Sequence, residues 1–141
     1  MNDVLVTIKG FFGCLLTGLL YLLGGWDIAL ECLLIAMALD YISGISKAIY
    51  TKQLDSKTGI KGIIKKVGII LLIALSVILD RIIGNTGLIR TFVIYYTVAN
   101  EGLSIVENLG AMNVLVPEIV KEKLKQLQKG SEEKWFIQLI I

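Results

Sequence analysis

Residues 67–79 have the sequence VGIILLIALSVIL, thirteen consecutive residues without a charge. The run is too long and too continuous for a half-buried strand, in which apolar and polar side chains would alternate. A helix rises about 1.5 Å per residue, so this run and its neighbours can cross a hydrocarbon core of roughly 30 Å. We therefore expect a membrane-spanning helix over residues 64–83.

Three other segments predict helices of similar length, at residues 5–26, 28–50 and 88–109. Glycine-containing turns at residues 24–26 and 84–87 separate the first helix from the second and the third from the fourth. The expected fold is all-α: a small multi-span transmembrane bundle of four helical segments, three or four of which span the membrane. We assign residues 1–110 to this transmembrane domain and residues 111–141 to a cytoplasmic basic tail.

Within this tail, a basic amphipathic helix is predicted at residues 118–127, after Pro117. Residues 130–133 indicate a flexible linker. Residues 135–141 are apolar but too few to span a membrane, and the sequence assigns them no role.

The composition argues against a soluble enzyme. Apolar residues make up 55% of the chain and the mean hydropathy is +0.77. There is no His, the side chain most often used for acid–base catalysis near neutral pH. Cys14 and Cys32 lie in apolar segments without a CxxC spacing, so we interpret them as packing residues. We expect no catalytic group, no metal and no cofactor.

Helix 28–50 carries an ionisable residue in its apolar part. Asp40, Ser43 and Lys47 share one helical face, whereas Glu31 lies on nearly the opposite face. A charge in mid-bilayer costs at least about 2.5–3.5 kcal/mol on insertion scales. Asp40 therefore either faces protein or water, or lies near the membrane surface and snorkels to it; the sequence leaves both open.

Helix 88–109 carries a polar stripe that cannot easily face lipid tails. The stripe should meet another helix, a partner subunit or water, and packing against the chain's own bundle is the simplest of these. Val93 is expected on the lipid-facing side. The residues of the stripe are Arg90, Thr97, Asn100, Glu101, Ser104, Glu107 and Asn108.

Small residues recur every fourth position in the first helix, at Gly10, Cys14 and Gly18. Such a face lets another membrane helix approach closely. It predicts helix packing, either within the subunit or between copies of the chain.

Basic residues open the third helix. Asp55 or Ser56 is expected to cap this helix. Its first turns predict an amphipathic segment lying on an anionic membrane leaflet, and they lead directly into a membrane span, which disfavours nucleic-acid binding. The membrane-surface basic residues are Lys57, Lys61, Lys65 and Lys66.

The distribution of lysines predicts the topology. Residues 47–66 contain six Lys, and the chain after residue 118 contains five. Because positively charged loops stay in the cytoplasm, both regions are expected there. Four spans with both termini inside satisfy this expectation, and three spans with one polar helix at the interface remain open.

Three stretches resemble the toxin-secretion and phage-lysis holin family. They are LDYISG at 39–44, the SKTG to KK segment at 56–66, and above all NEGLSIVEN at 100–108. The last is followed by VLVP at 114–117 and the Lys-rich helix, in the order that the family shows. The similarity covers most of residues 20–128, although one Pro stands where relatives often have two.

The resemblance implies a phage-encoded protein of the bacterial inner membrane that oligomerises and opens lesions in it. An endolysin, or in some relatives a toxin, then leaves through the lesions without specific binding. The implied partners are the lipid bilayer, further copies of the chain and an antiholin.

Other functions remain open. A regulatory, antiholin-type protein of the same family would have the same composition and differ in its effect on cells. A small channel or transporter is a further alternative, but the two halves of the chain show no convincing repeat. A membrane enzyme is the least favoured, because nucleophile, metal-ligand and phosphate-binding motifs are absent from the sequence.

Overall fold

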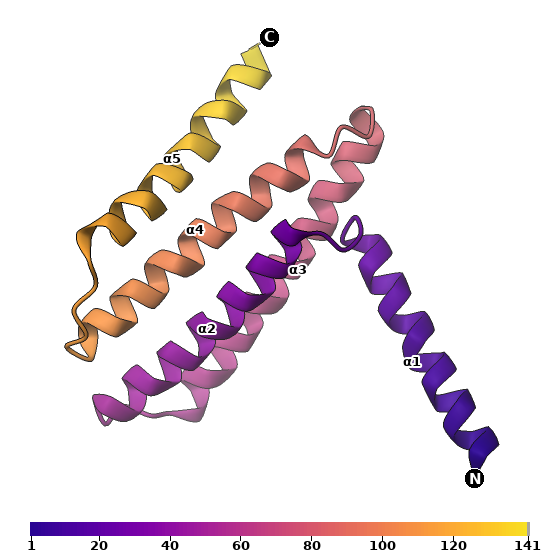
Figure 1. Cartoon of the computed structure of the whole chain (residues 1–141), viewed down its shortest axis with the longest axis horizontal. Helices are drawn as coiled ribbons and strands as arrows, with labels where there is room; N and C mark the ends of the chain where they lie inside the picture. The colour runs from indigo at the N-terminus through magenta and orange to yellow at the C-terminus, as the bar shows by residue number, and fades with distance from the viewer. Residues whose placement is uncertain (141) are drawn as a thin grey trace.

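The computed structural model describes residues 1–140, with side chains described up to residue 133. It is all-α over this range. The helices are α1 (Asn2–Leu22), α2 (Ile28–Tyr50), α3 (Ser56–Ile83), α4 (Leu88–Ala111) and α5 (Glu118–Ile140), in the order shown in Figure 1.

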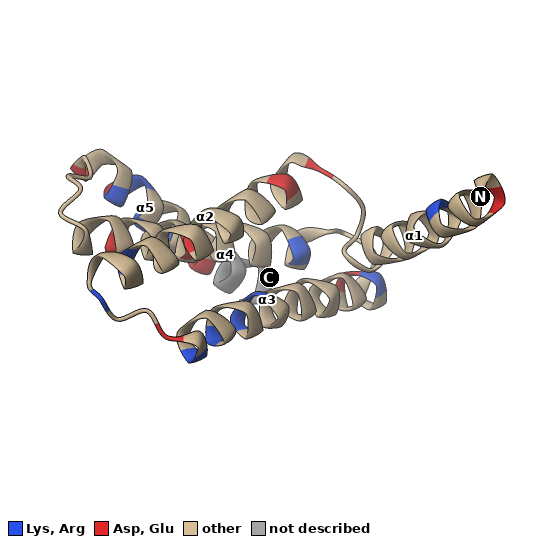
Figure 2. Cartoon of the chain, turned by 90° about the horizontal axis from the view of Figure 1, so that it is seen from below, with Lys and Arg blue, Asp and Glu red and all other residues tan. Residues whose placement is uncertain are grey.

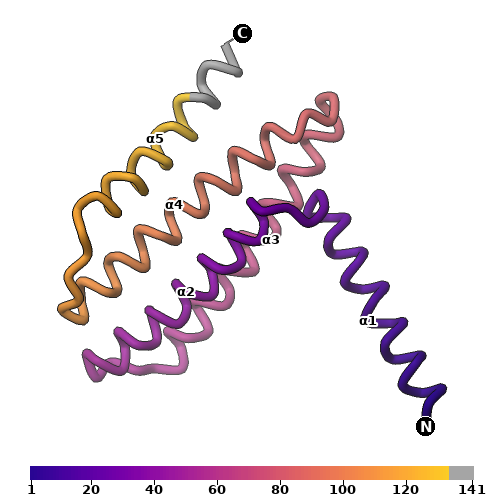
Figure 3. Tube along the Cα trace, viewed as in Figure 1, coloured from indigo at the N-terminus to yellow at the C-terminus, as the bar shows by residue number. Residues whose placement is uncertain are grey.

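Helices α2, α3 and α4 form a three-helix bundle, and α5 packs against α4. The α2–α3 and α4–α5 connections lie at one end of the bundle, which we call the basic end because of its lysines (Figures 1 and 3). Helix α1 points away from the bundle and buries none of its residues.

Polar side chains and glycines set the helix ends. The Asp27 carboxylate accepts a hydrogen bond from the Leu30 amide (2.8 Å) and caps α2. Asp55 accepts from the Lys57 amide (3.2 Å) and caps α3, which confirms the predicted cap. Gly84 ends α3 with φ of 138°, a conformation that L side chains rarely adopt.

A small apolar core holds the three-helix bundle together. Leu30 and Leu33 of α2, Ile73 of α3 and Ile94 of α4 have no exposed surface. Outside this core, large apolar side chains are exposed along α1 and the outer faces of α2 and α3. So much exposed apolar surface suits contact with lipid.

Among the residues that the structure describes, α1, α2 and α3 are long and apolar enough to cross a membrane. Helix α4 has 24 residues but carries Arg90, Glu101 and Glu107, and is not among these three. The domain division and the fourth span therefore stay predictions.

The expected linker at residues 130–133 is wrong. Helix α5 continues through these residues to Ile140, and Ser131 is buried with its hydroxyl donating to the Leu127 carbonyl (2.7 Å). The side chains of the apolar end, residues 135–141, lie outside the described residues.

The topology can be tested with single cysteines on a Cys14→Ala, Cys32→Ala background. Lys57→Cys and Lys123→Cys, both exposed near the basic end, should resist an impermeant thiol reagent in intact cells before lysis, because positive charge is retained inside. Trp26→Cys, in the α1–α2 turn, should label. Labelling of Lys123→Cys but not of Lys57→Cys would show that an odd number of membrane spans lies between residues 57 and 123.

Candidate functional site: polar networks inside the bundle

An ion-pair network joins α2, α3 and α4 in the interior of the bundle. The Lys66 ammonium of α3 donates to the carboxylates of Asp40 on α2 and Glu101 on α4. The Glu101 side chain has no exposed surface, and those of Asp40 and Lys66 are only 12% and 14% exposed. Lys65 Nζ lies 2.9 Å from the second Glu101 oxygen, at the surface of the network.

The network is balanced in charge. Two carboxylates face two ammonium groups, so their formal charges cancel, and the Ser104 hydroxyl lies within reach of Asp40. An uncompensated charge between apolar helices would cost several kcal/mol. Mutual pairing is therefore what allows Asp40, Lys66 and Glu101 to lie between helices of this hydropathy.

A further polar contact extends this network toward the basic end. The Asn108 amide of α4 donates to the Ser43 hydroxyl of α2 (3.0 Å), and both side chains are buried. Gly44 lies next to this contact, where an added Cβ would be 3.7 Å from Asn108 Nδ2. Polar contacts thus follow the α2–α4 interface from Asp40 to its basic end.

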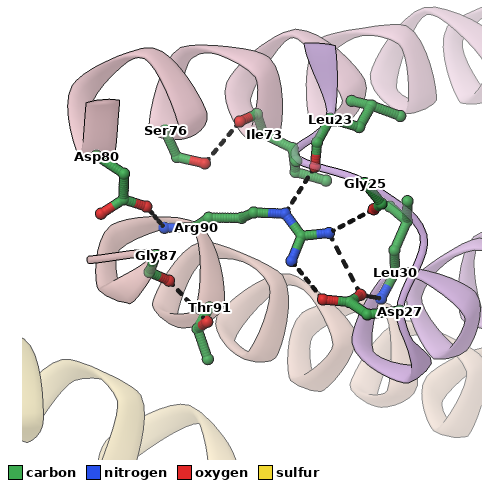
Figure 4. A network of polar contacts seen from close by, with 10 residues as sticks. All are labelled: Leu23, Gly25, Asp27, Leu30, Ile73, Ser76, Asp80, Gly87, Arg90 and Thr91. Atoms are coloured by element: carbon green, nitrogen blue, oxygen red, sulfur yellow. Dashed lines mark hydrogen bonds and ion pairs between the residues drawn. The ribbon is translucent and has the colours of Figure 1, made fainter. Parts of the chain in front are cut away.

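A second network lies at the opposite end of the bundle and centres on Arg90 (Figure 4). The Arg90 guanidinium of α4 donates to the carbonyls of Leu23 (2.6 Å) and Gly25 (3.1 Å) and to the Asp27 carboxylate (2.6 Å). A Cβ at Gly24 would lie 2.7 Å from Arg90 Nε, so this turn requires glycine. Arg90 thereby fastens the α1–α2 turn to α4.

The same network caps α4 from another helix. Asp80, buried near the end of α3, accepts hydrogen bonds from the amides of Ile89 (3.1 Å) and Arg90 (2.8 Å) and from the Thr86 hydroxyl (3.2 Å). The residue at the N-cap position itself, Gly87, has no side chain to do this. Asp80 therefore satisfies amides that the first turn of a helix leaves free.

Arg90 also affects the ionisation of its partner. The hydrogen bond from Arg90 lowers the pKa of Asp27 below its ordinary value of 3.8, against the opposing effect of partial burial. Asp27 is thus a carboxylate at neutral pH. It contributes stability that is complete above pH ~4 and is lost as the pH falls through its lowered pKa.

Most of the predicted stripe on α4 faces the bundle. Arg90, Thr97, Glu101 and Asn108 are buried, and Ser104 is half-buried. The chain's own helices therefore cover most of the stripe, as the simplest interpretation expected.

Two stripe residues lie elsewhere. Asn100 accepts a hydrogen bond from Gln128 of α5 (2.7 Å), and Glu107 is exposed. Next to Asn100, Leu124 of α5 packs so closely on Gly102 that an added Cβ would lie 2.5 Å from its Cδ2. The NEGLS segment thus faces α5 as well as the bundle.

On α2 the structure separates the two polar residues of the predicted face. Asp40 turns into the bundle and pairs with Lys66, so it faces protein in this structure. Lys47 is half-buried and makes no ion pair within the described part of the chain.

Two expectations about orientation need correction. Lys66 was grouped with the surface lysines, yet it lies inside, because it is rotated by about 100° from Lys65 on the helix. Val93 was expected to face lipid, yet it packs against the core. It follows Arg90 by three residues and precedes Thr97 by four, which places it on the buried face.

The other predicted residues lie on the surface. Lys57, Lys61 and Lys65 are exposed along the first turns of α3, where Figure 2 shows positive charge gathering. On α1, Gly10, Cys14 and Gly18 are exposed, and an added Cβ at either glycine would meet nothing within 4 Å. Within the described part of the chain, no other helix packs on this face of α1. Its role in self-association stays a prediction.

Asp27 and Asp80 have partners on α4 that the sequence did not reveal. Arg90 lies 63 residues after Asp27 and 10 residues after Asp80, beyond any local spacing rule. A signal for Asp80 exists in retrospect: α4 begins after Gly87, which cannot supply a side-chain cap.

These observations define a class of protein: a multi-pass helical membrane protein whose bundle encloses paired charges. Residues 17–129 match the model of the bacteriophage holin family, and the chain belongs to that family, whose members are not enzymes. No solved structure matches the chain.

Relatives cover most of the chain. An uncharacterized 14.9 kDa protein in the nagH 3′ region of Clostridium perfringens is 40% identical over 90% of this chain and 97% of its own length. An uncharacterized protein of Listeria monocytogenes is 41% identical over 72% of each chain. A probable holin of Bacillus phage phi105 is 29% identical over 74% of this chain and 78% of its own.

Proposed function

We propose that this chain is a holin that accumulates in the bacterial inner membrane, oligomerises there and opens lesions through which an endolysin reaches the cell wall. The observation that carries the proposal is the charge-balanced network in which Lys66, Asp40 and Glu101 lie inside the bundle and Lys65 completes the pairing at its surface. Family membership and the phage relative named a probable holin support it.

The network gives the chain two ways to satisfy the same charges. In the packing described here the charges satisfy one another, so the subunit can accumulate among lipids. When subunits associate and the helices separate, the same groups can line water, where each is hydrated individually. A lesion of this kind is a second packing of the same helices, separated from the first by a few kcal/mol.

The proposal also assigns location and partners. The C-terminus lies in the cytoplasm, in keeping with the lysines of α5. The partners are the bilayer, other copies of this chain and an antiholin, and the cargo is an endolysin, or a toxin as in some relatives, that passes without specific binding.

The test is induced expression of this chain alone in bacteria. Growth should stop, and a potential-sensitive dye should report an abrupt collapse of membrane potential after a lag, as the accumulated protein changes its packing. Co-expression of a cytoplasmic endolysin without its own export signal should then lyse the cells. An empty vector with the same endolysin is the control.

Full membrane potential in cells that have accumulated the protein in their membranes would contradict the proposal. It would assign the chain to the regulatory members of the family. Collapse of the potential without release of the endolysin would instead indicate a small channel.

A further inference from the structure

A groove between α2 and α3 borders the interior ion-pair network. Its wider part is a cavity of about 700 Å³ near the basic end. It is lined by the second half of α2, the α2–α3 loop and the first turns of α3, with Ser104 and Asn108 of α4 on one side. A second cavity of about 430 Å³ continues along the same two helices toward the middle of the bundle. Both volumes lie within the range of roughly 300–1,000 Å³ that is typical of small-molecule sites.

The two cavities meet at Tyr41 and Ile63, which line both. Glycines make room for this crossing: an added Cβ at Gly62 would lie 3.3 Å from the Tyr41 ring, and one at Gly59 would lie 3.6 Å from its hydroxyl. The cavities are thus successive parts of one groove between α2 and α3.

The two parts differ in chemistry. The inner cavity is lined almost entirely by apolar side chains, among them Leu34, Met37 and Ile70. Lys66 also lines it, but its ammonium is directed to Asp40 and Glu101. A long hydrocarbon chain suits this part of the groove.

The outer cavity has a positively charged rim. Lys47 lines it and makes no ion pair within the described part of the chain, and Lys65 lines it beside Glu101. Two acidic residues also line it, but Asp40 is held by Lys66 and Asp55 by the Lys57 amide. Figure 2 shows further lysines on the adjoining turns of α3, which are exposed at the same end.

We propose that this groove binds one anionic phospholipid, with the phosphate at Lys47 and an acyl chain in the apolar part between α2 and α3. A charged head and an apolar tail match the order of the two cavities. The basic end is also where the anionic leaflet would lie if the lysine-rich segments are cytoplasmic. The site does not depend on lesion formation.

The test is native mass spectrometry of the purified full chain in detergent, titrated with dioleoylphosphatidylglycerol or dioleoylphosphatidylcholine. One phosphatidylglycerol per subunit should be retained in preference to phosphatidylcholine. Lys47→Gln should weaken this binding about fivefold, as expected for loss of one surface lysine. Lys47→Arg should retain the binding.

Lys61→Gln is the matched control, because Lys61 is exposed on α3 and does not line the groove. It removes the same charge and should leave the binding unchanged. Ala38→Phe, which fills the apolar part, should weaken binding of the same lipid, and circular dichroism should show unchanged helix content for every variant.

A photoactivatable acyl chain locates the lipid. Cross-links should fall on α2 and α3 around residues 34–41 and 63–71. Equal retention of both lipids, or equal losses in Lys47→Gln and Lys61→Gln, would overturn the site in favour of diffuse attraction. Cross-links of the acyl chain that fall on the outward-facing residues of α1 or evenly over all helices would likewise overturn the site.

Discussion

Replacing Lys66 with methionine is expected to remove most of the folded protein from the membrane. Methionine fills similar space without a charge, so the carboxylates of Asp40 and Glu101 would face each other across the α2–α4 interface without their shared partner. Removing one member of a buried ion pair costs about 3–5 kcal/mol. That cost is a large fraction of the stability of a small domain.

The measurements are the amount of protein in the membrane fraction and the thermal unfolding of the detergent-solubilised protein. Lys61→Met changes an exposed lysine five residues earlier on α3 and is the matched control, which should change neither. If Lys66→Met is as abundant and as stable as Lys61→Met, the interior network does not hold the bundle together.

A triple variant separates stability from function. Lys66→Met together with Asp40→Leu and Glu101→Leu removes every charge that the single change leaves unpaired. Apolar replacement of a whole buried ion-pair network is often neutral or stabilising, so this variant should accumulate normally. Under the proposed function it should not collapse the membrane potential, because the interior ion-pair network no longer supplies charges that can line water.

The single change Glu101→Leu should be milder than Lys66→Met. Asp40 keeps Lys66 as its partner, and Lys65, whose side chain is 53% exposed, returns to water. Lys66 pairs with two carboxylates, so its replacement should destabilise the bundle more than replacement of Glu101.

Helix positions were predictable because local signals determine them. The predicted helix 28–50 matches α2, since Asp27 caps its start and the apolar run that follows has no breaker. For α3 the cap at Asp55 was also recognisable, but the amphipathic first turns and the apolar span proved to be one continuous helix from Ser56 to Ile83.

The pairing of charges was not predictable from one sequence. Lys65 and Lys66 are adjacent, so their side chains point about 100° apart, and only the crossing of α2 and α4 over α3 decides which one turns inward. In the same way, Asp80 directly follows the uncharged run at residues 67–79 and is typical of the end of a membrane span. Its role as the cap of α4 depends on how the chain reverses at residues 84–87.

The tail shows the opposite difficulty, because composition alone was misleading there. Gly130 and Ser131 with two glutamates are typical of a linker, yet α5 continues through them. Contacts between α5 and α4, such as Gln128 with Asn100 and Leu124 with Gly102, support the helix from outside its own sequence. Tertiary contacts of this kind routinely override local propensity.

Replacing Arg90 with methionine is expected to detach the α1–α2 turn from α4. The change removes every hydrogen bond that the guanidinium donates to the carbonyls of Leu23 and Gly25 and to Asp27. Leaving buried acceptors unpaired costs about 1–3 kcal/mol each, so the loss in unfolding free energy should be on the order of 3 kcal/mol. Asp27 adds less to this cost because its side chain is 47% exposed and can regain water.

Hydrogen exchange and thermal unfolding of the solubilised protein are the readouts for Arg90→Met. Amide exchange should accelerate in residues 23–30, and the unfolding temperature should fall. Arg81→Met is the matched control: Arg81 is exposed and contacts the Tyr21 ring and carbonyl, so its loss should change the unfolding temperature little. Arg90→Lys should fall between the two, because a single ammonium cannot reproduce the forked donors of a guanidinium.

Acid titration gives the Arg90 prediction a second, independent signature. In the unmodified chain the lowered pKa of Asp27 means that its contribution is complete above pH ~4 and is lost below it, as the carboxylate is protonated. In Arg90→Met the pKa of Asp27 loses its largest lowering influence, so this part of the acid dependence should shrink. Arg81→Met should keep the acid dependence of the unmodified chain. An equal acid dependence in all three proteins, together with unchanged exchange at residues 23–30, would show that Arg90 does not fasten the turn.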